Sequence, residues 1–232
     1  MTTYNAWLAV QQGRYSPPKP GAATPPPPPP TRYLVTGRDL ASYLHADFSY
    51  QAYTNAGLIL NKLGFLDAGN PYLHSKTQAG VATFGPAHLF DLVSKVANAA
   101  IKACWYQKWL VHRRLRPEEF GGRVHNHKTG AAPYPIHADL LAHSGALAAT
   151  AQKYGSYLLP LQFPEGAPNH PSYPAGHCAI TGACVTVLKA WFDESATMPA
   201  PVVASADGSA LVPYGGAPLT VGGELNKLAG TC

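Results

Sequence analysis

The stretch PAHLFDLVSKVANAAIKACWYQKWLVHRRL, residues 86–115, has the spacing of a long amphipathic helix. Pro86 suits a first helical position, because its ring fixes φ and its missing N–H would have no partner there. Pro117 disfavours helical backbone at Arg116, so we expect the helix to end near Leu115 and Arg116 to lie in a turn. Residues spaced three and four apart are expected to form one helix face: Leu89, Leu92, Val93, Val96, Ala100, Ala103, Gln107 and Leu110.

Four further segments show helical patterns. Residues 37–63 repeat apolar side chains three and four apart, as one amphipathic helix would. Residues 136–154 are rich in alanine, and residues 175–192 form an apolar run that begins at residue 175 or 176. A last helix is predicted for residues 220–229, and a short hairpin for residues 201–211. The predicted fold class is therefore all-α, a helical bundle.

Segments rich in glycine, asparagine or proline separate these helices. Residues 69–85 and 118–135 are expected to be long ordered loops. Nine of the 23 prolines lie within residues 17–30, which predicts an extended polyproline II linker. We therefore expect an N-terminal segment with this linker, residues 1–31, followed by a helical domain, residues 32–232.

The composition favours a well-packed protein and an anionic ligand. Apolar residues make up 46% of the 232 residues and charged residues only 12%, so extensive packing or a large subunit interface is expected. Seventeen Lys and Arg against twelve Asp and Glu give a net charge of +5, and the ten histidines can add charge below about pH 6.5. No basic stripe with interleaved aromatic residues is present, which argues against nucleic acid as a partner.

The cysteines and the first residues bear on the compartment. Cys104, Cys178, Cys184 and Cys232 are too dispersed for a disulfide framework, which favours a reducing compartment. The N-terminal residues lack a basic start followed by an apolar run, and no run of 18 apolar residues occurs. We expect no visible signal peptide, no membrane as a partner and, by default, a cytoplasmic location.

Residues 108–122, KWLVHRRLRPEEFGG, concentrate positive charge at the end of an apolar helix. Lys108 and Arg116 lie eight residues apart, about 80° around a helix, so both can reach one anion. Cations near a helix C-terminus also complement the helix dipole, which is the purely structural interpretation. The cationic or titratable side chains here are Lys108, His112, Arg113, Arg114 and Arg116.

Residues 169–183, NHPSYPAGHCAITGA, bring a Pro-Ala-Gly-His turn to the start of a predicted helix. Unpaired backbone N–H groups at a helix N-terminus favour a bound oxyanion, and Gly176 allows close approach of the backbone. His177 in the first turn can exchange a proton with an oxygen of that anion. A structural histidine is the alternative for this position taken alone.

Together the two motifs resemble the superfamily of vanadium-dependent haloperoxidases and type 2 phosphatidic acid phosphatases. Its pattern is a Lys, an Arg-Pro pair and a Pro-Ser-Gly-His turn, followed by another Arg and His. Lys108, Arg116-Pro117 and Pro174-Ala175-Gly176-His177 match it. The strings HRRLRPEEFGGRVHNH and HPSYPAGH are similar to the bromoperoxidase branch. The resemblance covers residues 32–232, which would form a partial haloperoxidase-like catalytic domain.

The resemblance implies vanadate as the cofactor. Lys108, Arg116 and the Gly176 backbone N–H would hold it, with His177 as the acid–base residue. It also implies His170 beside the oxyanion and Trp105 in the halide pocket. The implied partners are hydrogen peroxide, a halide such as bromide, and a small organic substrate that the resulting hypohalous acid halogenates. Members of this branch form large homo-oligomers, and we expect the same here.

The sequence departs from the family pattern at three places. Ala175 stands where the family has serine, which removes a hydroxyl donor typically contributing about 1–2 kcal/mol to anion binding. No Arg and His pair follows His177, so the histidine that bonds vanadium directly is expected beyond Cys232. Residues 69–85 contain no Asp or Glu, so the calcium site of some family members is not expected.

Other interpretations of the same residues remain open. Phosphate and vanadate are near-isosteric, so the site could hydrolyse phosphoesters, or the chain could be a non-catalytic helical fragment. His125-Asn126-His127 resembles a metal-binding pair, but no third ligand is nearby, so a polar loop is favoured. Cys178 lies where a helix start would favour a thiolate, but no His or Asn partner follows it, so we expect a small core thiol.

Overall fold

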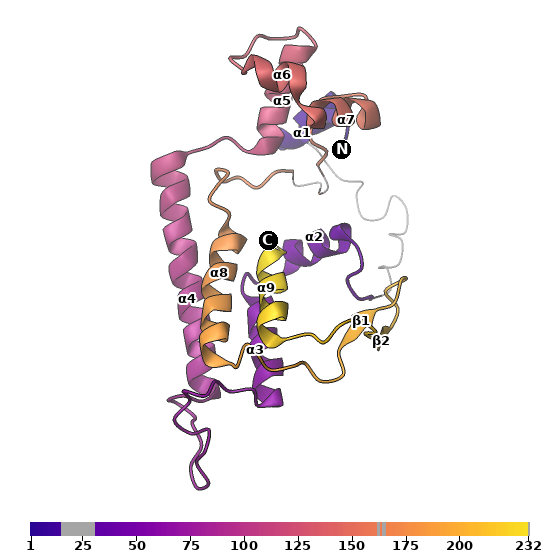
Figure 1. Ribbon diagram of the computed structural model, residues 1–232. Coiled ribbons are helices and arrows are strands. Elements are labelled where there is room, and N and C mark those ends of the chain that lie inside the picture. Colours follow the sequence, from indigo (N-terminus) through magenta and orange to yellow (C-terminus); the bar gives the residue numbers. More distant parts are fainter. Residues whose placement is uncertain (15–30, 162, 164–165, 232) are drawn as a thin grey trace, which may run out of the picture. The chain divides into compact units, whose positions relative to one another are not determined.

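The computed structural model describes residues 1–14, 31–161, 163 and 166–231, and the predicted polyproline segment lies outside them. The chain has an all-α fold with long ordered loops and a small hairpin (Figure 1). It divides into two compact units. In the described part, the first unit contains residues 1–14 and residues from 107 to 173, and the second contains residues 31–106 and 174–231.

The first unit is built from short helices. They are α1 (Tyr4–Gln11), the π-helix η1 (Gln107–His112), α5 (Pro117–Lys128), α6 (Ala138–His143) and α7 (Gly145–Tyr154). The second unit contains the longer ones. Its elements are α2 (Gly37–Ala46), α3 (Gln51–Leu63), α4 (Pro86–Tyr106), α8 (Gly176–Trp191), β1 (Val202–Ala204), β2 (Leu211–Pro213) and α9 (Val221–Gly230).

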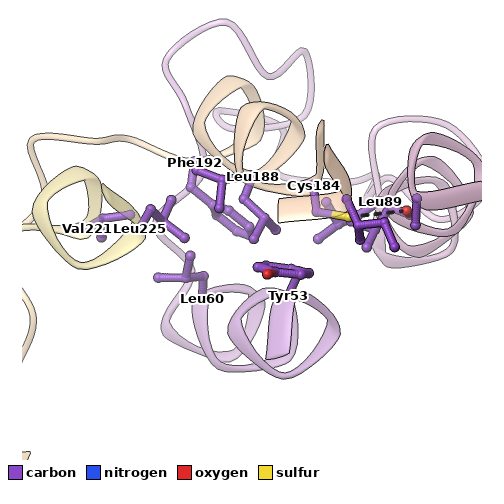
Figure 2. Packing of buried hydrophobic residues seen from close by; sticks show 12 residues of the cluster. Tyr53, Leu60, Leu89, Cys184, Leu188, Phe192, Val221 and Leu225 are labelled. Atoms are coloured by element: carbon purple, nitrogen blue, oxygen red, sulfur yellow. Dashed lines mark hydrogen bonds between the residues drawn. The ribbon is translucent and has the colours of Figure 1, made fainter. Parts of the chain in front are cut away.

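The core of the second unit lies between α3, α4, α8 and α9, with α4 and α8 running side by side (Figure 1). Figure 2 shows Tyr53 and Leu60 of α3 facing Leu188 and Phe192, at the end of α8. Cys184 donates from its thiol to the Val93 carbonyl across 3.7 Å. Burial raises the pKa of the Cys184 thiol to about 12, so this cysteine is a neutral part of the core.

The predicted helix over residues 37–63 is wrong in one respect, because it is two helices. Asp47 takes an extended backbone with φ −74° and ψ 159°, which ends α2, and α3 begins at Gln51. The side chain of Asp47 is turned toward His177, 130 residues away in sequence. The apolar repeat continues through this break, because the repeat depends only on local spacing. It does not indicate that the Asp47 side chain contacts a distant residue.

The long helix from Pro86 changes character before it ends. α4 stops at Tyr106, and residues 107–112 continue as a π-helix, so helical structure ends three residues before Leu115. Arg113 has a positive φ of 46° and donates its N–H to the Lys108 carbonyl, which closes the last π turn. Arg116 is extended, with φ −67° and ψ 147°, as the following proline predicts.

The expectation of a loop over residues 118–135 is wrong, because most of it forms α5. Pro117 occupies the first position of that helix, and Glu118 and Glu119 lie in its first turn, where their charge complements the helix dipole. Lys128 complements the dipole in the last turn. The paired glycines that suggested a loop are instead buried packing positions.

The remaining elements follow the predictions more closely. The single helix expected over residues 136–154 is α6 and α7, interrupted at Ser144, whose ψ of 109° is not helical. Helices α8 and α9 confirm the segments predicted near residues 176 and 220, and β1 pairs with β2 as the expected short hairpin.

The N-terminal helix α1 was not predicted. Its Trp7 and Val10 pack on Leu158 and Leu161. Among the helices described, none is long and apolar enough to cross a membrane.

Two glycines are expected to respond oppositely to alanine. A Cβ at Gly122 would overlap the indole ring of Trp7, whereas a Cβ at Gly182, within α8, would meet no atom within 4 Å. We expect Gly122→Ala to lower the free energy of unfolding by about 1–3 kcal/mol through overpacking. Gly182→Ala should raise it by up to about 1 kcal/mol through helix propensity. Urea denaturation measures both, and a neutral Gly122→Ala would contradict the packing described for α1 and α5.

Candidate anion site

Lys108 is a buried cation of the first unit. It lies in η1, its exposed fraction is 5%, and its Nζ is 3.2 Å from Nδ1 of His170. The ammonium group can only donate, so this hydrogen bond forms when Nδ1 of His170 is unprotonated. When Nδ1 is protonated it can donate instead to the Pro171 carbonyl, 2.9 Å away. The structure therefore brings together two of the residues assigned to the oxyanion.

Arg116 is held by a carboxylate from its own turn. Its Nε and Nη2 donate to Oε2 and Oε1 of Glu118, both across 3.1 Å, and both side chains are about four-fifths buried. Burial alone would raise the pKa of the Glu118 carboxyl. Hydrogen bonds from the Arg116 side chain and the Glu118 backbone, together with the charges of Arg116 and His170, outweigh this effect. The pKa of Glu118 is therefore lower than its ordinary value. This fork fixes the guanidinium and leaves its Nη1 for another acceptor.

The Glu118 fork predicts a dependence of stability on pH. A carboxyl group with a lowered pKa in the folded state stabilises the fold above its ordinary pKa of about 4.3, and this contribution is lost as the pH falls through the lowered value. We expect Glu118→Gln to cost about 1 kcal/mol at pH 7, and the difference from the unmodified protein to shrink at pH 3. Glu119→Gln, which removes the adjacent carboxylate, is the control, and urea denaturation is measured at both pH values. An equal loss of unfolding free energy in Glu119→Gln would contradict the assignment.

A pocket of about 560 Å³ opens in the first unit. Its walls come from residues 109–123 and 168–171. The Arg114 carbonyl accepts from the Ser172 N–H across 2.9 Å, which ties these two segments together. Four arginines against one glutamate make the pocket strongly positive. Its charged and titratable lining is Arg113, Arg114, Arg116, Arg123, Glu119 and His170.

The second motif forms the start of α8 in the second unit. Ala175 is the N-cap residue, and no side chain caps the helix there. A Cβ at Gly176 would lie 2.9 Å from Cδ1 of Ile101, so a glycine fits the packing of α8 against α4. The Cys104 thiol donates to the Pro174 carbonyl across 3.0 Å and holds the preceding turn. Backbone N–H groups in the first turn of a helix suit an anion.

His177 has a carboxylate partner that sequence reasoning did not find. Its Nε2 lies 3.4 Å from Oδ1 of Asp47, whose side chain is 5% exposed. A buried carboxylate beside an imidazole orients the ring. No local pattern could have revealed Asp47, whereas Glu118 stands two residues after Arg116 and could have been proposed as its partner.

The predicted site residues therefore fall into two sets. Lys108, Arg116 and His170 belong to the first unit, where Lys108 contacts His170, and Arg116 and His170 line one pocket. Ala175, Gly176 and His177 belong to the second unit, as does Trp105, which is half exposed on α4. That the two sets surround one vanadate stays a prediction.

Three further residues have structural partners or a changed assignment. His125 Nδ1 accepts from the Tyr157 N–H and His127 Nδ1 accepts from the Tyr134 N–H, so both imidazoles support the backbone of the first unit. Burial lowers the pKa of His125. The expectation that Cys178 is a core thiol is wrong, because this cysteine is exposed in the first turn of α8.

Comparison with known proteins gives a consistent set of relatives, although no family model matches the chain. Vanadium-dependent bromoperoxidases from Ascophyllum nodosum and Corallina pilulifera are 37% and 39% identical to it, over 99% of this chain and 42% and 41% of the relatives. A solved homohexameric vanadate-dependent bromoperoxidase from Ascophyllum nodosum superposes with a TM-score of 0.82 at 29% identity, covering 100% of this chain and 42% of that one. The chain spans about two fifths of the length of the curated relatives it matches. In its sequence and its fold, the chain is similar to about two fifths of the vanadium-dependent bromoperoxidases it matches.

Proposed function

We propose that the chain carries the vanadate-binding part of a bromoperoxidase, which uses hydrogen peroxide to oxidise bromide to hypobromous acid that halogenates small organic molecules. The observation that carries the proposal is the buried Lys108 ammonium beside His170, next to a pocket rich in arginine. A cationic hydrogen-bond donor beside a pocket lined by several arginines suits an anionic ligand.

The donor chemistry fits an oxyanion. Lys108 and Arg116 can only donate hydrogen bonds, and the backbone N–H groups at the start of α8 also donate. A divalent cation needs acceptor ligands instead, and within the described residues no group of three or more His, Cys, Asp or Glu is placed to hold a metal ion. Vanadium fits this donor set as vanadate.

The residues of the chain have separable roles in this proposal. Lys108, Arg116 and the Gly176 N–H would hold vanadate, with Glu118 orienting Arg116. When bound, vanadate supplies a Lewis-acidic centre that activates peroxide toward bromide without changing its own oxidation state. His177, oriented by Asp47, would move the proton, and Trp105 would line the halide pocket.

The decisive assay gives the full-length protein, with the segment in which the vanadium-bonding histidine is expected, vanadate, hydrogen peroxide and bromide and follows bromination of a dye. Equilibrium dialysis with vanadate measures binding separately from turnover. Bromination that depends on both vanadate and bromide supports the proposal. Hydrolysis of a phosphate ester without bromination would favour the phosphatase-like function. The absence of both activities, together with the absence of vanadate binding, would indicate a non-catalytic chain.

Restoring a hydroxyl at Ala175 is expected to improve vanadate binding. This residue precedes the first turn of α8 and has no side-chain donor. Ala175→Ser should tighten vanadate binding roughly five- to tenfold, because one hydrogen bond to a charged group contributes on the order of 1–1.5 kcal/mol. Ala179→Ser makes the same chemical change one turn later and should leave the dissociation constant unchanged. An equal effect of the two would contradict an anion at the helix start.

We also propose that the chain acts in a homo-oligomer. The support is the homohexameric state of the similar solved structure and a row of exposed apolar side chains. On α4 and η1, apart from the two tryptophans assigned to pockets, these are Tyr106, Leu110 and Val111. Analytical ultracentrifugation tests this, and a monomer at micromolar concentration would contradict it.

A further inference from the structure

The pocket of the first unit has more positive charge than a vanadate site built from Lys108 and Arg116 requires. Arg116 is already paired with Glu118, and Lys108 contacts His170. Arg113 and Arg114 also line the pocket. Over the part of the chain that the structure describes, neither of their guanidinium groups has a hydrogen-bond or ion-pair partner. Arg123, the remaining arginine of the lining, lies over the Tyr134 ring, 5.6 Å from its centroid. Among the described residues, Arg113 and Arg114 are therefore the two arginines of the pocket whose side chains have no such contact.

The backbone at the first of these two arginines is strained. Arg113 has a φ of 46°, in the left-handed region that favours glycine, yet it is an arginine that ends η1 there. The next residue, Arg114, is tied through its carbonyl to Ser172, so the turn is held on both sides of the pocket. Backbone strain that the surrounding structure maintains is a reason to look for a ligand.

The shape and remaining lining of the pocket suggest an organic ligand. Its volume of about 560 Å³ lies within the ~300–1,000 Å³ range of pockets for organic molecules. Trp109 and Leu115 contribute apolar lining next to the arginines, and Pro168 and Pro171 contribute it from the other segment. An aromatic ring can contact Trp109 while an anionic group pairs with a guanidinium.

We propose that this pocket binds an aromatic carboxylate, with Arg113 and Arg114 holding the carboxylate and Trp109 contacting the ring. The inference rests on the proposed function in one respect, which is that this molecule is the organic substrate. Hypobromous acid would then transfer its bromine to a ring carbon and form the C–Br bond. The ring carbon loses its proton, and the oxygen of hypobromous acid leaves as water.

Direct binding tests the pocket without turnover. Isothermal titration of the 232-residue chain with para-hydroxybenzoate, without vanadate or bromide, should give saturable binding. The neutral para-hydroxybenzamide, with nearly the same shape, should bind more than about tenfold more weakly. Equal binding of the two, or no binding of the carboxylate, would overturn the proposal. Dye bromination is measured separately in the same preparation. A failure of carboxylate binding is therefore distinguished from a failure of the proposed bromoperoxidase activity.

Variants identify the residues responsible. Arg113→Gln combined with Arg114→Gln should weaken para-hydroxybenzoate binding by more than about tenfold. Arg38→Gln, an exposed arginine of α2, should leave it unchanged. Arg113→Gly removes the charge while relieving the positive φ, so it should fold at least as well and still lose affinity. A comparable loss for Arg38→Gln, or undiminished binding by Arg113→Gly and by the double variant, would overturn the assignment.

Inorganic phosphate distinguishes an organic ligand from a small inorganic anion. We expect phosphate to bind more weakly than para-hydroxybenzoate and to be insensitive to Trp109→Leu. That variant should weaken the aromatic carboxylate, since the ring loses its contact. If phosphate binds as tightly as the carboxylate with the same dependence on Arg113 and Arg114, the pocket recognises an inorganic anion and the proposal is wrong.

Discussion

Replacing Lys108 by alanine is expected to lower bromination by about 100-fold or more, the usual effect of removing one charged donor from a preorganised anion site. The ammonium group is buried and lies 3.2 Å from His170 Nδ1. Vanadate binding measured by dialysis should weaken in parallel, because a donor to the anion contributes before any turnover.

Two variants control for this prediction. Lys102→Ala removes an exposed lysine of α4 and should leave activity nearly unchanged. His125→Ala removes an imidazole that accepts from the Tyr157 N–H, so it should affect stability more than vanadate binding. Equal losses of vanadate affinity for Lys108→Ala and His125→Ala would remove Lys108 from the anion site.

The second large effect concerns the core that positions α8. Phe192→Ala is expected to lower the free energy of unfolding by about 3–5 kcal/mol, since it leaves a large cavity. Phe192 has an exposed fraction of 0% and ends α8, where its N–H donates to the Leu188 carbonyl. It also bridges to Leu66, so its loss affects both the helix and the following chain.

An exposed phenylalanine provides the control for Phe192. Phe48 belongs to the same unit and has an exposed fraction of 51%. Phe48→Ala should therefore cost less than about 1 kcal/mol, as surface substitutions usually do. Urea denaturation followed by circular dichroism measures both, and similar losses would contradict the core shown in Figure 2.

Helix type was predictable where the apolar repeat is long. α8 and α9 begin where their sequences indicate, because Gly176 and Thr220 stand at turns that precede periodic apolar residues. The sequence over residues 118–135 misled because its paired glycines resemble a loop. In the structure the backbone at Gly121 lies against Leu159, and Gly122 lies against Trp7. Glycine there makes room for a neighbour rather than for a turn, and a single sequence does not distinguish these uses.

What the sequence alone determined is which residues are candidates for an anion site. Lys108, Arg116 and the Gly176-His177 turn match the motifs of an anion-binding superfamily, and they can be recognised because charge and backbone donors are properties of residue type and local order. The tertiary structure decided which partners these groups have. Glu118 accepts hydrogen bonds from Arg116, and His170 accepts one from Lys108. Asp47 lies beside His177, although the two are 130 residues apart in sequence. Hydrogen bonds and burial depend on distances in space, and an apolar repeat reports only spacing along the chain.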